Sequence, residues 1–235
     1  MQKGKLYLIP TTLGDSAVDN VIPSYNREVI NKISIYIVEE VRTARRFLKK
    51  AGLIMPIDEL VFFELNEHTK PEEIGLYLNA IDNGENIGLL SEAGVPCIAD
   101  PGAEIVKIAQ QKNIEVIPLV GPSSILLALM ASGFNGQQFA FLGYLPVDKN
   151  QRINKIKEIE KNIFLRNETQ IFIETPYRNN QLIEALLQTC RNETLLCIAS
   201  DITLETAFIK TKTIAAWKNT VPDFHKKTTV FLLYK

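Results

Sequence analysis

Hydrophobic residues along this chain of 235 residues gather in short runs, and polar segments of helical composition separate them. In the first half, five runs rich in leucine and β-branched residues predict strands. These runs cover residues 6–10, 33–38, 60–64, 86–90 and 114–118. The intervening segments predict helices at 16–30, 42–50, 71–83 and 104–111, the first interrupted or restarted at Pro23. Strands that alternate with helices need crossover connections, so a mainly parallel sheet is expected.

The second half shows a different order of the same two patterns. Its predicted strands cover residues 139–143, 170–174, 195–200, 205–211 and 228–234. Its predicted helices cover residues 125–132, 149–166 and 177–190. The last three strands follow one another with little helix between them, which favours a mixed, partly antiparallel sheet. We therefore expect an α/β fold of two domains, residues 1–118 and 119–235.

Composition and charge narrow the class of protein. The chain is 46% hydrophobic and 23% charged, which is typical of a globular protein. Its formal net charge is −1, although residues 151–235 carry a net +4 and residues 1–150 a net −5. A dedicated nucleic-acid binder usually has a clear basic excess. The basic half either steers an anionic substrate or is an ordinary solvated surface.

Several other site classes find no support in the sequence. The three cysteines have no repeated spacing, and the two histidines, His68 and His225, have no partnered ligand pattern, so no metal site is expected. The N-terminal residues lack the apolar stretch of a secretion signal. No apolar run approaches the ~20 residues of a membrane helix. We expect a cytoplasmic protein without membrane association.

Four segments carry candidate chemistry. The turn Pro10–Gly14 follows the first strand, and the small-residue loop 91–102 follows the fourth. In open α/β sheets, ligands bind at such carboxyl strand ends. The segment 120–124 precedes an apolar helix whose start could hold a carboxylate. The segment 173–178 passes from a strand into a helix and carries a carboxylate, an aromatic ring and an arginine.

Each segment also has a plainer structural explanation. The first could be only a turn, and the loop 91–102 could be a stiff connection in which Asp100 caps the next helix. The third could be an ordinary helix cap. In the fourth, Glu174 could simply pair with Arg178, which at a surface contributes little stability. For the loop 91–102 the functional explanation is favoured, because twelve residues with two prolines and two glycines exceed what a connection needs.

Taken in order, these segments resemble the tetrapyrrole methylase superfamily, and within it the bacterial branch that methylates a ribose 2′-hydroxyl of small-subunit ribosomal RNA. The match spans nearly the whole chain. Residues 39–52 parallel the family's Glu-Asp-Thr-Arg segment, and residues 91–102, SEAGVPCIADPG, are close to its most specific loop. The stretches GPSSILLALMASGF, FAFLGYLP and FIETPYR continue the correspondence. The resemblance implies a homodimer of two α/β domains that binds S-adenosylmethionine (SAM) in the cleft between them.

The resemblance also assigns residues to roles. Donor binding falls to Pro10, Leu13, Ser91, Glu92, Ala93, Gly94, Val95, Ile98, Ser123, Ser124, Leu142, Glu174, Thr175 and Tyr177. Substrate binding falls to Arg42, Asn66, His68 and Arg178. Because a hydroxyl acceptor benefits from a general base, Glu92 and Glu174 are the candidate catalytic residues.

The chain departs from the family pattern at four positions. Glu40 and Glu92 stand where the family has aspartate, Val41 where it has threonine, and Leu204 where it has lysine. The methyl-donor segments are better preserved than the substrate segments. Two alternatives to RNA methylation therefore stay open. One is methyl transfer to a small molecule such as a corrin-type macrocycle, and the other is a SAM-binding protein without turnover.

Overall fold

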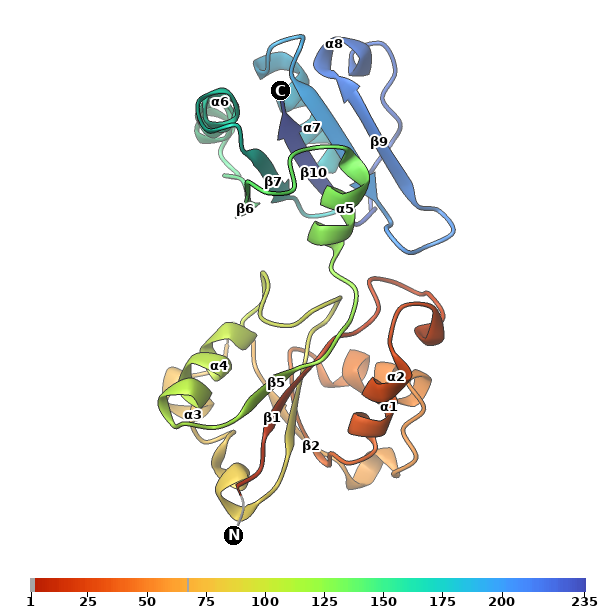
Figure 1. Ribbon diagram of the computed structural model, residues 1–235, viewed down its shortest axis with the longest axis vertical. Helices are drawn as coiled ribbons and strands as arrows, with labels where there is room; N and C mark the ends of the chain where they lie inside the picture. The colour runs from red at the N-terminus through yellow and green to blue at the C-terminus, as the bar shows by residue number, and fades with distance from the viewer. Residues whose placement is uncertain (1–2, 67) are drawn as a thin grey trace. The chain divides into compact units, whose positions relative to one another are not determined.

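The computed structural model describes residues 3–66 and 68–235, and the chain forms two compact units that divide after Ser123. Each unit is built around its own five-stranded sheet (Figure 1). In the first unit the strands are β1 (Leu6–Ile9), β2 (Ile35–Val38), β3 (Val61–Glu64), β4 (Ile87–Leu90) and β5 (Val116–Pro118). They lie in the order β3-β2-β4-β1-β5, and every neighbouring pair is parallel, as the alternating pattern predicted.

Helices cover both faces of the first sheet (Figure 1). The helices are α1 (Ser24–Ile30), α2 (Val41–Lys50), α3 (Pro71–Ile74) and α4 (Gly102–Gln111). Successive strand residues point to opposite faces. Thus Tyr36 and Val38 pack with α1 and α2, whereas Ile37 between them packs with α4. Buried side chains on both faces explain why these strands are almost continuously apolar.

Two of the predicted helices of this unit are shorter than expected. The segment 16–30 starts as a short 3-10 helix, Val18–Asn20, and α1 begins only after Pro23. The ring of proline fixes φ, so the helix restarts there, as the sequence suggested. The segment 71–83 is not one helix either: α3 ends at Ile74, and a 3-10 helix covers Asn79–Asn83. Gly75 follows α3 directly, and glycine has a low helix propensity.

The second unit has the mixed sheet that the closely spaced strands predicted. Its strands are β6 (Phe139–Tyr144), β7 (Thr169–Ile173), β8 (Leu195–Ser200), β9 (Phe208–Thr213) and β10 (Thr229–Tyr234). They lie in the order β6-β7-β10-β8-β9. Only β6 and β7 pair in parallel, whereas β10 runs antiparallel to both β7 and β8. The carboxyl ends of β6, β7 and β8 therefore lie at one edge of this sheet.

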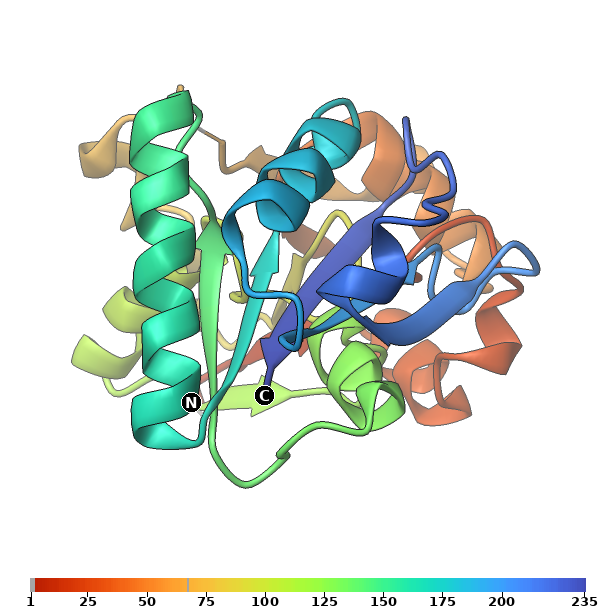
Figure 2. The same ribbon diagram turned by 90° about the horizontal axis from the view of Figure 1, so that it is seen from above.

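The helices of the second unit also lie on both faces of its sheet. They are α5 (Ser124–Ser132), α6 (Lys149–Arg166), α7 (Asn179–Thr189) and α8 (Ile214–Trp217). The last three lie on one face of the sheet (Figure 2). They bury a core that includes Phe172 and Phe231. Trp217 is fully buried in that core and donates its indole N–H to the carbonyl of Leu196 at 2.8 Å. On the other face, α5 packs against β9 and β10.

The buried hydroxyl of Tyr36 gives a direct test of the first core. It donates to the carbonyl of Ile30 at 3.0 Å and is excluded from solvent. Tyr36→Phe leaves that carbonyl without this partner, so we expect a loss of about 1–3 kcal/mol in the free energy of unfolding, measured by urea denaturation. Tyr144→Phe is the control, because Tyr144 is 56% exposed and should tolerate the change. Equal stability of both variants would contradict this description of the core.

Candidate functional site

The carboxyl edge of the first sheet has the topology of a ligand site. The chain leaves β1 and β2 towards the face covered by α1 and α2. It leaves β4, which lies between those two strands, towards the opposite face covered by α4. Neighbouring loops that diverge to opposite faces open a crevice at the carboxyl ends of the strands, where α/β proteins bind ligands. The loop 91–102 begins at this point.

Three of the predicted segments meet at Gly94. The backbone N–H of Thr11 donates to the carbonyl of Gly94 at 2.9 Å. A Cβ placed on Gly94 would lie 2.8 Å from both Leu13 Cδ2 and the carbonyl oxygen of Pro122. The turn after β1, the loop after β4 and the segment after β5 therefore form one cluster of loops, which we call the Gly94 cluster. Glycine is required at its centre because no side chain fits there.

The Gly94 cluster contains a buried polar atom that could serve a ligand. Thr11 is 4% exposed, and its Oγ1 has no hydrogen-bond partner within the described residues. A buried hydroxyl without a partner is costly, so its presence points to a group that is supplied from outside the protein or to a bound water. Sequence reasoning missed this residue, although it lies between the predicted Pro10 and Leu13.

The loop 91–102 is held in an unusual backbone conformation. Cys97 and Ala99 have φ angles of +69° and +61°, in the left-handed region that side chains disfavour. Asp100 stabilises the turn, since its Oδ1 accepts from the N–H groups of Cys97 and Gly102 at 2.8 Å each. Backbone strain of this kind concentrates at functional sites. Asp100 thus also fixes the start of α4. This is the capping role expected if the loop 91–102 is a stiff connection.

Three carboxylates influence one another at this edge. Burial is the main cause that raises the pKa of Glu39, and the nearby charges of Glu92 and Asp100 raise it further. The pKa of Asp100 is also raised, again mainly by burial, although its two backbone hydrogen bonds oppose the shift. Like charges close together disfavour ionisation. The edge of the sheet therefore presents negative potential beside the Gly94 cluster.

A hydrogen bond connects α2 with the loop 91–102. Glu40 precedes α2 and caps it, accepting from the N–H groups of Arg42 and Thr43 at 2.7 and 2.9 Å. The hydroxyl of Thr43 then donates to Glu92 Oε1 at 2.7 Å. Glu92 is exposed, so its carboxylate is fixed on one side and open to solvent. Thr43 was not among the predicted site residues, and only the structure joins it to Glu92.

The other residues predicted for the first unit lie along the same edge. Asn66 follows β3, and its Oδ1 accepts from the backbone N–H of His68 at 3.0 Å. Ser91 is buried, and its hydroxyl accepts from the N–H of Ala93 at 3.2 Å. Val95 is half-buried and Ile98 is 50% exposed. Ser123 ends the first unit, and Ser124 begins α5 in the second.

In the second unit, Glu174 lies at the carboxyl end of β7 and is buried. Its Oε1 accepts from the N–H of Thr175 at 2.6 Å and from Arg178 Nη2 at 2.7 Å. The expected pair of Glu174 with Arg178 therefore forms, but the Glu174 side chain is 0% exposed and that of Arg178 31% exposed, so its description as a surface pair is wrong. Glu174 Oε2 is buried without a partner among the described residues. This oxygen is a buried acceptor whose hydrogen-bonding capacity the described residues do not use.

Two further predicted residues of this unit differ in their surroundings. Tyr177 is 70% exposed, with its ring edge-on to His225 at 5.7 Å between centroids. Leu142 is partly buried and packs against the core under α6 and α7. Its donor-binding role stays a prediction.

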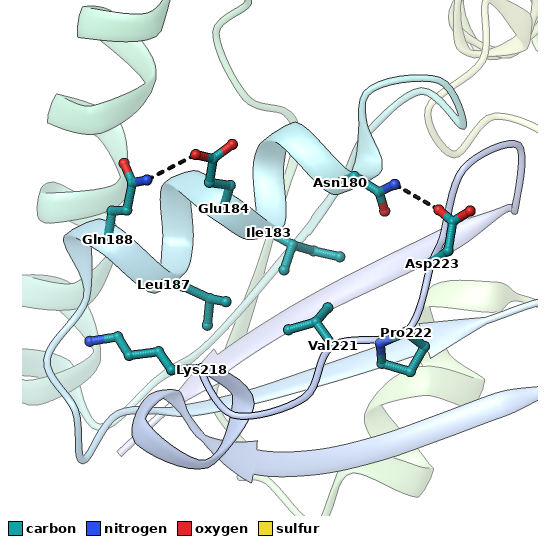
Figure 3. Close-up of a pocket in the computed structure, with 9 residues that line it drawn as sticks. All are labelled: Asn180, Ile183, Glu184, Leu187, Gln188, Lys218, Val221, Pro222 and Asp223. Atoms are coloured by element: carbon teal, nitrogen blue, oxygen red, sulfur yellow. Dashed lines mark hydrogen bonds between the residues drawn. The ribbon is translucent and has the colours of Figure 1, made fainter.

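A hollow of about 500 Å³ lies between α7 and the segment 218–223 (Figure 3). Ile183, Leu187 and Val221 form an apolar floor. Four of its polar groups pair with each other, since Asn180 donates to Asp223 at 2.7 Å and Gln188 donates to Glu184 at 3.0 Å. The fifth, Lys218, donates to Asn192 at 2.8 Å. Since these groups are already partnered, the hollow offers a ligand mainly apolar surface.

The comparisons with known proteins establish the family and support the fold. The model of the family Tetrapyrrole (Corrin/Porphyrin) Methylases matches residues 28–216. The chain belongs to this family. Solved structures support the fold: the methyltransferase CobJ aligns with a TM-score of 0.66 at 14% identity, over 99% of this chain and 94% of its own. Cobalt precorrin-4 methyltransferase aligns with a TM-score of 0.60 at 13% identity, over 98% of this chain and 94% of its own.

Relatives of higher identity carry the name ribosomal RNA small subunit methyltransferase I. The protein of Pseudomonas aeruginosa is 30% identical over 79% of this chain and 61% of its own length. That of Bacillus subtilis is 31% identical over 79% of this chain and 59% of its own. That of Buchnera aphidicola is 28% identical over 98% of this chain and 78% of its own. The chain thus spans about three fifths of the length of the first two relatives.

Two features are absent from residues 3–66 and 68–235, the part of the chain that the structure describes. In this part of the chain, no three His, Cys, Asp or Glu side chains are grouped so that they could share a metal ion. In the same part, no helix combines the length and the apolar character needed to cross a membrane.

Gly94→Ala tests the packing of the Gly94 cluster. The substitution adds a Cβ in close contact with Pro122 and strains a residue with φ of +76°. We expect a loss of about 1–3 kcal/mol in the free energy of unfolding, measured by urea denaturation. Gly133→Ala is the matched control, because Gly133 has φ of +78° but open space around it. The Gly94 variant should lose more than the control, and equal losses would mean that the three segments are not packed together.

Glu39→Gln tests the electrostatics of the edge. A raised folded-state pKa means that the folded chain holds the proton more tightly than the unfolded chain. The stability from Glu39 is therefore full below its ordinary pKa and is lost as pH rises through the raised value. The variant should match the native chain at acid pH and exceed its stability near neutrality, as measured by urea denaturation across this range. The exposed Glu104→Gln should show no such gain, and a pH-independent difference for Glu39→Gln would contradict the shift.

Proposed function

We propose that this chain is a SAM-dependent methyltransferase that methylates a ribose 2′-hydroxyl of small-subunit ribosomal RNA. The observation that carries the proposal is the Gly94 cluster at the switch point of the first sheet, in a chain of the tetrapyrrole methylase family. The names of the relatives support RNA as the substrate. The homodimer implied by the resemblance and the cytoplasmic location expected from the apolar pattern of the sequence belong to the same proposal.

The residues of the Gly94 cluster fit a nucleoside with a charged amino-acid tail. Close backbone approach at Gly94 suits a flat ring, and the unpartnered hydroxyl of Thr11 can bind a polar atom of the ligand. Pro10, Leu13 and the residues of the loop 91–102 would hold the donor in the first unit. In the second unit, Glu174 carries a buried oxygen, Oε2, without a partner among the described residues, which is chemically able to accept from an N–H or O–H group. The negative edge favours a cationic sulfonium over its neutral product.

For this reaction the protein mainly has to position the donor and the acceptor and to remove the proton of the acceptor hydroxyl. When bound, the donor would supply a sulfonium methyl group whose carbon the acceptor oxygen attacks in line, so that the C–O bond forms as the C–S bond breaks and the neutral thioether leaves. The enzyme gains most by holding donor and acceptor in the reactive geometry. We assign the general base to Glu92, because its carboxylate is exposed on one side and oriented by Thr43 on the other. Glu174 is instead held by Arg178 and is assigned to binding.

Methyl transfer from tritiated SAM tests the proposal and the role of Glu92 together. The native chain should bind SAM in a calorimeter and label small-subunit RNA taken from cells that lack the gene. Glu92→Gln should lower kcat by about 10²–10⁴-fold, because it removes the base and keeps the hydrogen bond from Thr43. Glu72→Gln, an exposed residue in the first turn of α3, is the control and should keep full activity.

The outcomes separate the parts of the proposal. Binding of SAM without labelling of any RNA would contradict the assigned substrate. Labelling of a tetrapyrrole alone would show that the acceptor is a macrocycle. Absence of binding heat at millimolar SAM would contradict the assignment as a SAM-dependent methyltransferase. Full activity of Glu92→Gln would contradict only the assignment of Glu92 as the general base.

A further inference from the structure

The helix α2 carries an unusual concentration of positive charge. Its five charged residues are all basic, and all five are exposed. They are Arg42, Arg45, Arg46, Lys49 and Lys50. The opposite side of the helix is buried through Ala44, Phe47 and Leu48. The helix therefore packs its apolar side against the sheet and exposes a side whose charged residues are all basic to solvent.

This charge contrasts with the rest of the first unit. Residues 1–123 contain 12 Lys and Arg against 17 Asp and Glu. Outside α2 the count is 7 against 17. Because the rest of the unit is acidic, a polyanion that binds to this unit is expected to bind at the cationic face of α2. The net charge of −5 over residues 1–150 alone does not reveal this local concentration of positive charge.

The cations of α2 are only partly neutralised by the protein. Lys50 pairs with Asp15, and the guanidinium of Arg45 lies over the ring of Phe62, 5.3 Å from its centroid. The charged groups of Arg42, Arg46 and Lys49 make no hydrogen bond or salt bridge to the described part of the chain. Like charges three or four residues apart on a helix repel each other, so this arrangement costs stability. A partner that binds these charges would offset the repulsion.

The cationic face starts next to the proposed methyl-transfer site. The first turn of α2 is tied to the loop 91–102 by the hydrogen bond from Thr43 to Glu92. From Arg42 to Lys49 the face then extends roughly 10 Å along the helix axis. A charged track of that length beside the site suits an acceptor that continues beyond the methylated group.

We propose that the exposed face of α2, through Arg46 and Lys49 beyond the predicted Arg42, binds the phosphate backbone of the RNA that flanks the methylated nucleotide. This proposal rests on the proposed function, since it takes RNA as the substrate. Among the described residues of α2, no large apolar side chain is exposed, which argues against insertion into a membrane. Phosphate contacts of this kind position a substrate without reading its sequence.

The double variant Arg46→Gln, Lys49→Gln tests whether the exposed face of α2 binds RNA. A fluorescein-labelled single-stranded RNA 20-mer is titrated in fluorescence anisotropy at several salt concentrations. The variant should bind roughly tenfold more weakly, and the slope of log affinity against log salt should shrink by about 1.4, because two phosphate contacts are lost. Lys157→Gln, Lys161→Gln is the control, since it removes the same charge from the exposed side of α6.

A charge-preserving exchange and three further readouts complete the test. Arg46→Lys, Lys49→Arg should keep the affinity. For the neutralised pair, KM for small-subunit RNA should rise more than kcat falls, SAM affinity should stay the same, and the melting temperature should not drop. The proposed role of the α2 face would be overturned if the α6 control lost as much RNA affinity as the neutralised pair. It would also be overturned if the native chain methylates RNA and the neutralised pair keeps the same KM. Neither result would contradict the proposed methyltransferase function. Stronger binding to phosphatidylglycerol vesicles than to RNA would also overturn the role of the α2 face, whereas a native chain that never labels RNA contradicts the proposed function itself.

Discussion

The close packing at Gly94 is the constraint on which the first unit's site depends. One backbone hydrogen bond from Thr11 and the contacts to Leu13 and Pro122 bring together three segments that are far apart in sequence. The parallel order of the strands places these segments at one edge, and the absence of a side chain at residue 94 lets them touch. The strained turn at Cys97 and Ala99, secured by Asp100, then fixes the shape of the longest loop.

The same edge combines opposite charges in adjacent places. Glu39, Glu92 and Asp100 give negative potential beside the Gly94 cluster, which suits a cationic methyl donor. The helix α2 begins at this edge and turns only positive charge outward, which suits an anionic acceptor. The hydrogen bond from Thr43 to Glu92 connects the cationic helix with the acidic edge. In the proposed function, donor and acceptor would therefore bind to oppositely charged parts of a single unit whose net charge is negative.

Much of the fold could be predicted from the sequence, because apolar strand runs and turn residues are local signals. The parallel first sheet, the mixed second sheet and the restart of a helix at Pro23 followed from such patterns. The break after Ile74 was missed, since the apolar spacing of 71–83 continues through it. The burial of Glu174 and the link from Thr43 to Glu92 depend on contacts between distant segments, which no local pattern encodes.

Hydrogen–deuterium exchange with and without SAM tests the central claim most directly, because it asks whether one ligand touches all three segments of the Gly94 cluster. The account predicts that SAM slows exchange together in residues 10–14, 91–102 and 120–124, while α6 is unaffected. Protection confined to one of these segments, or found only elsewhere in the chain, would contradict it.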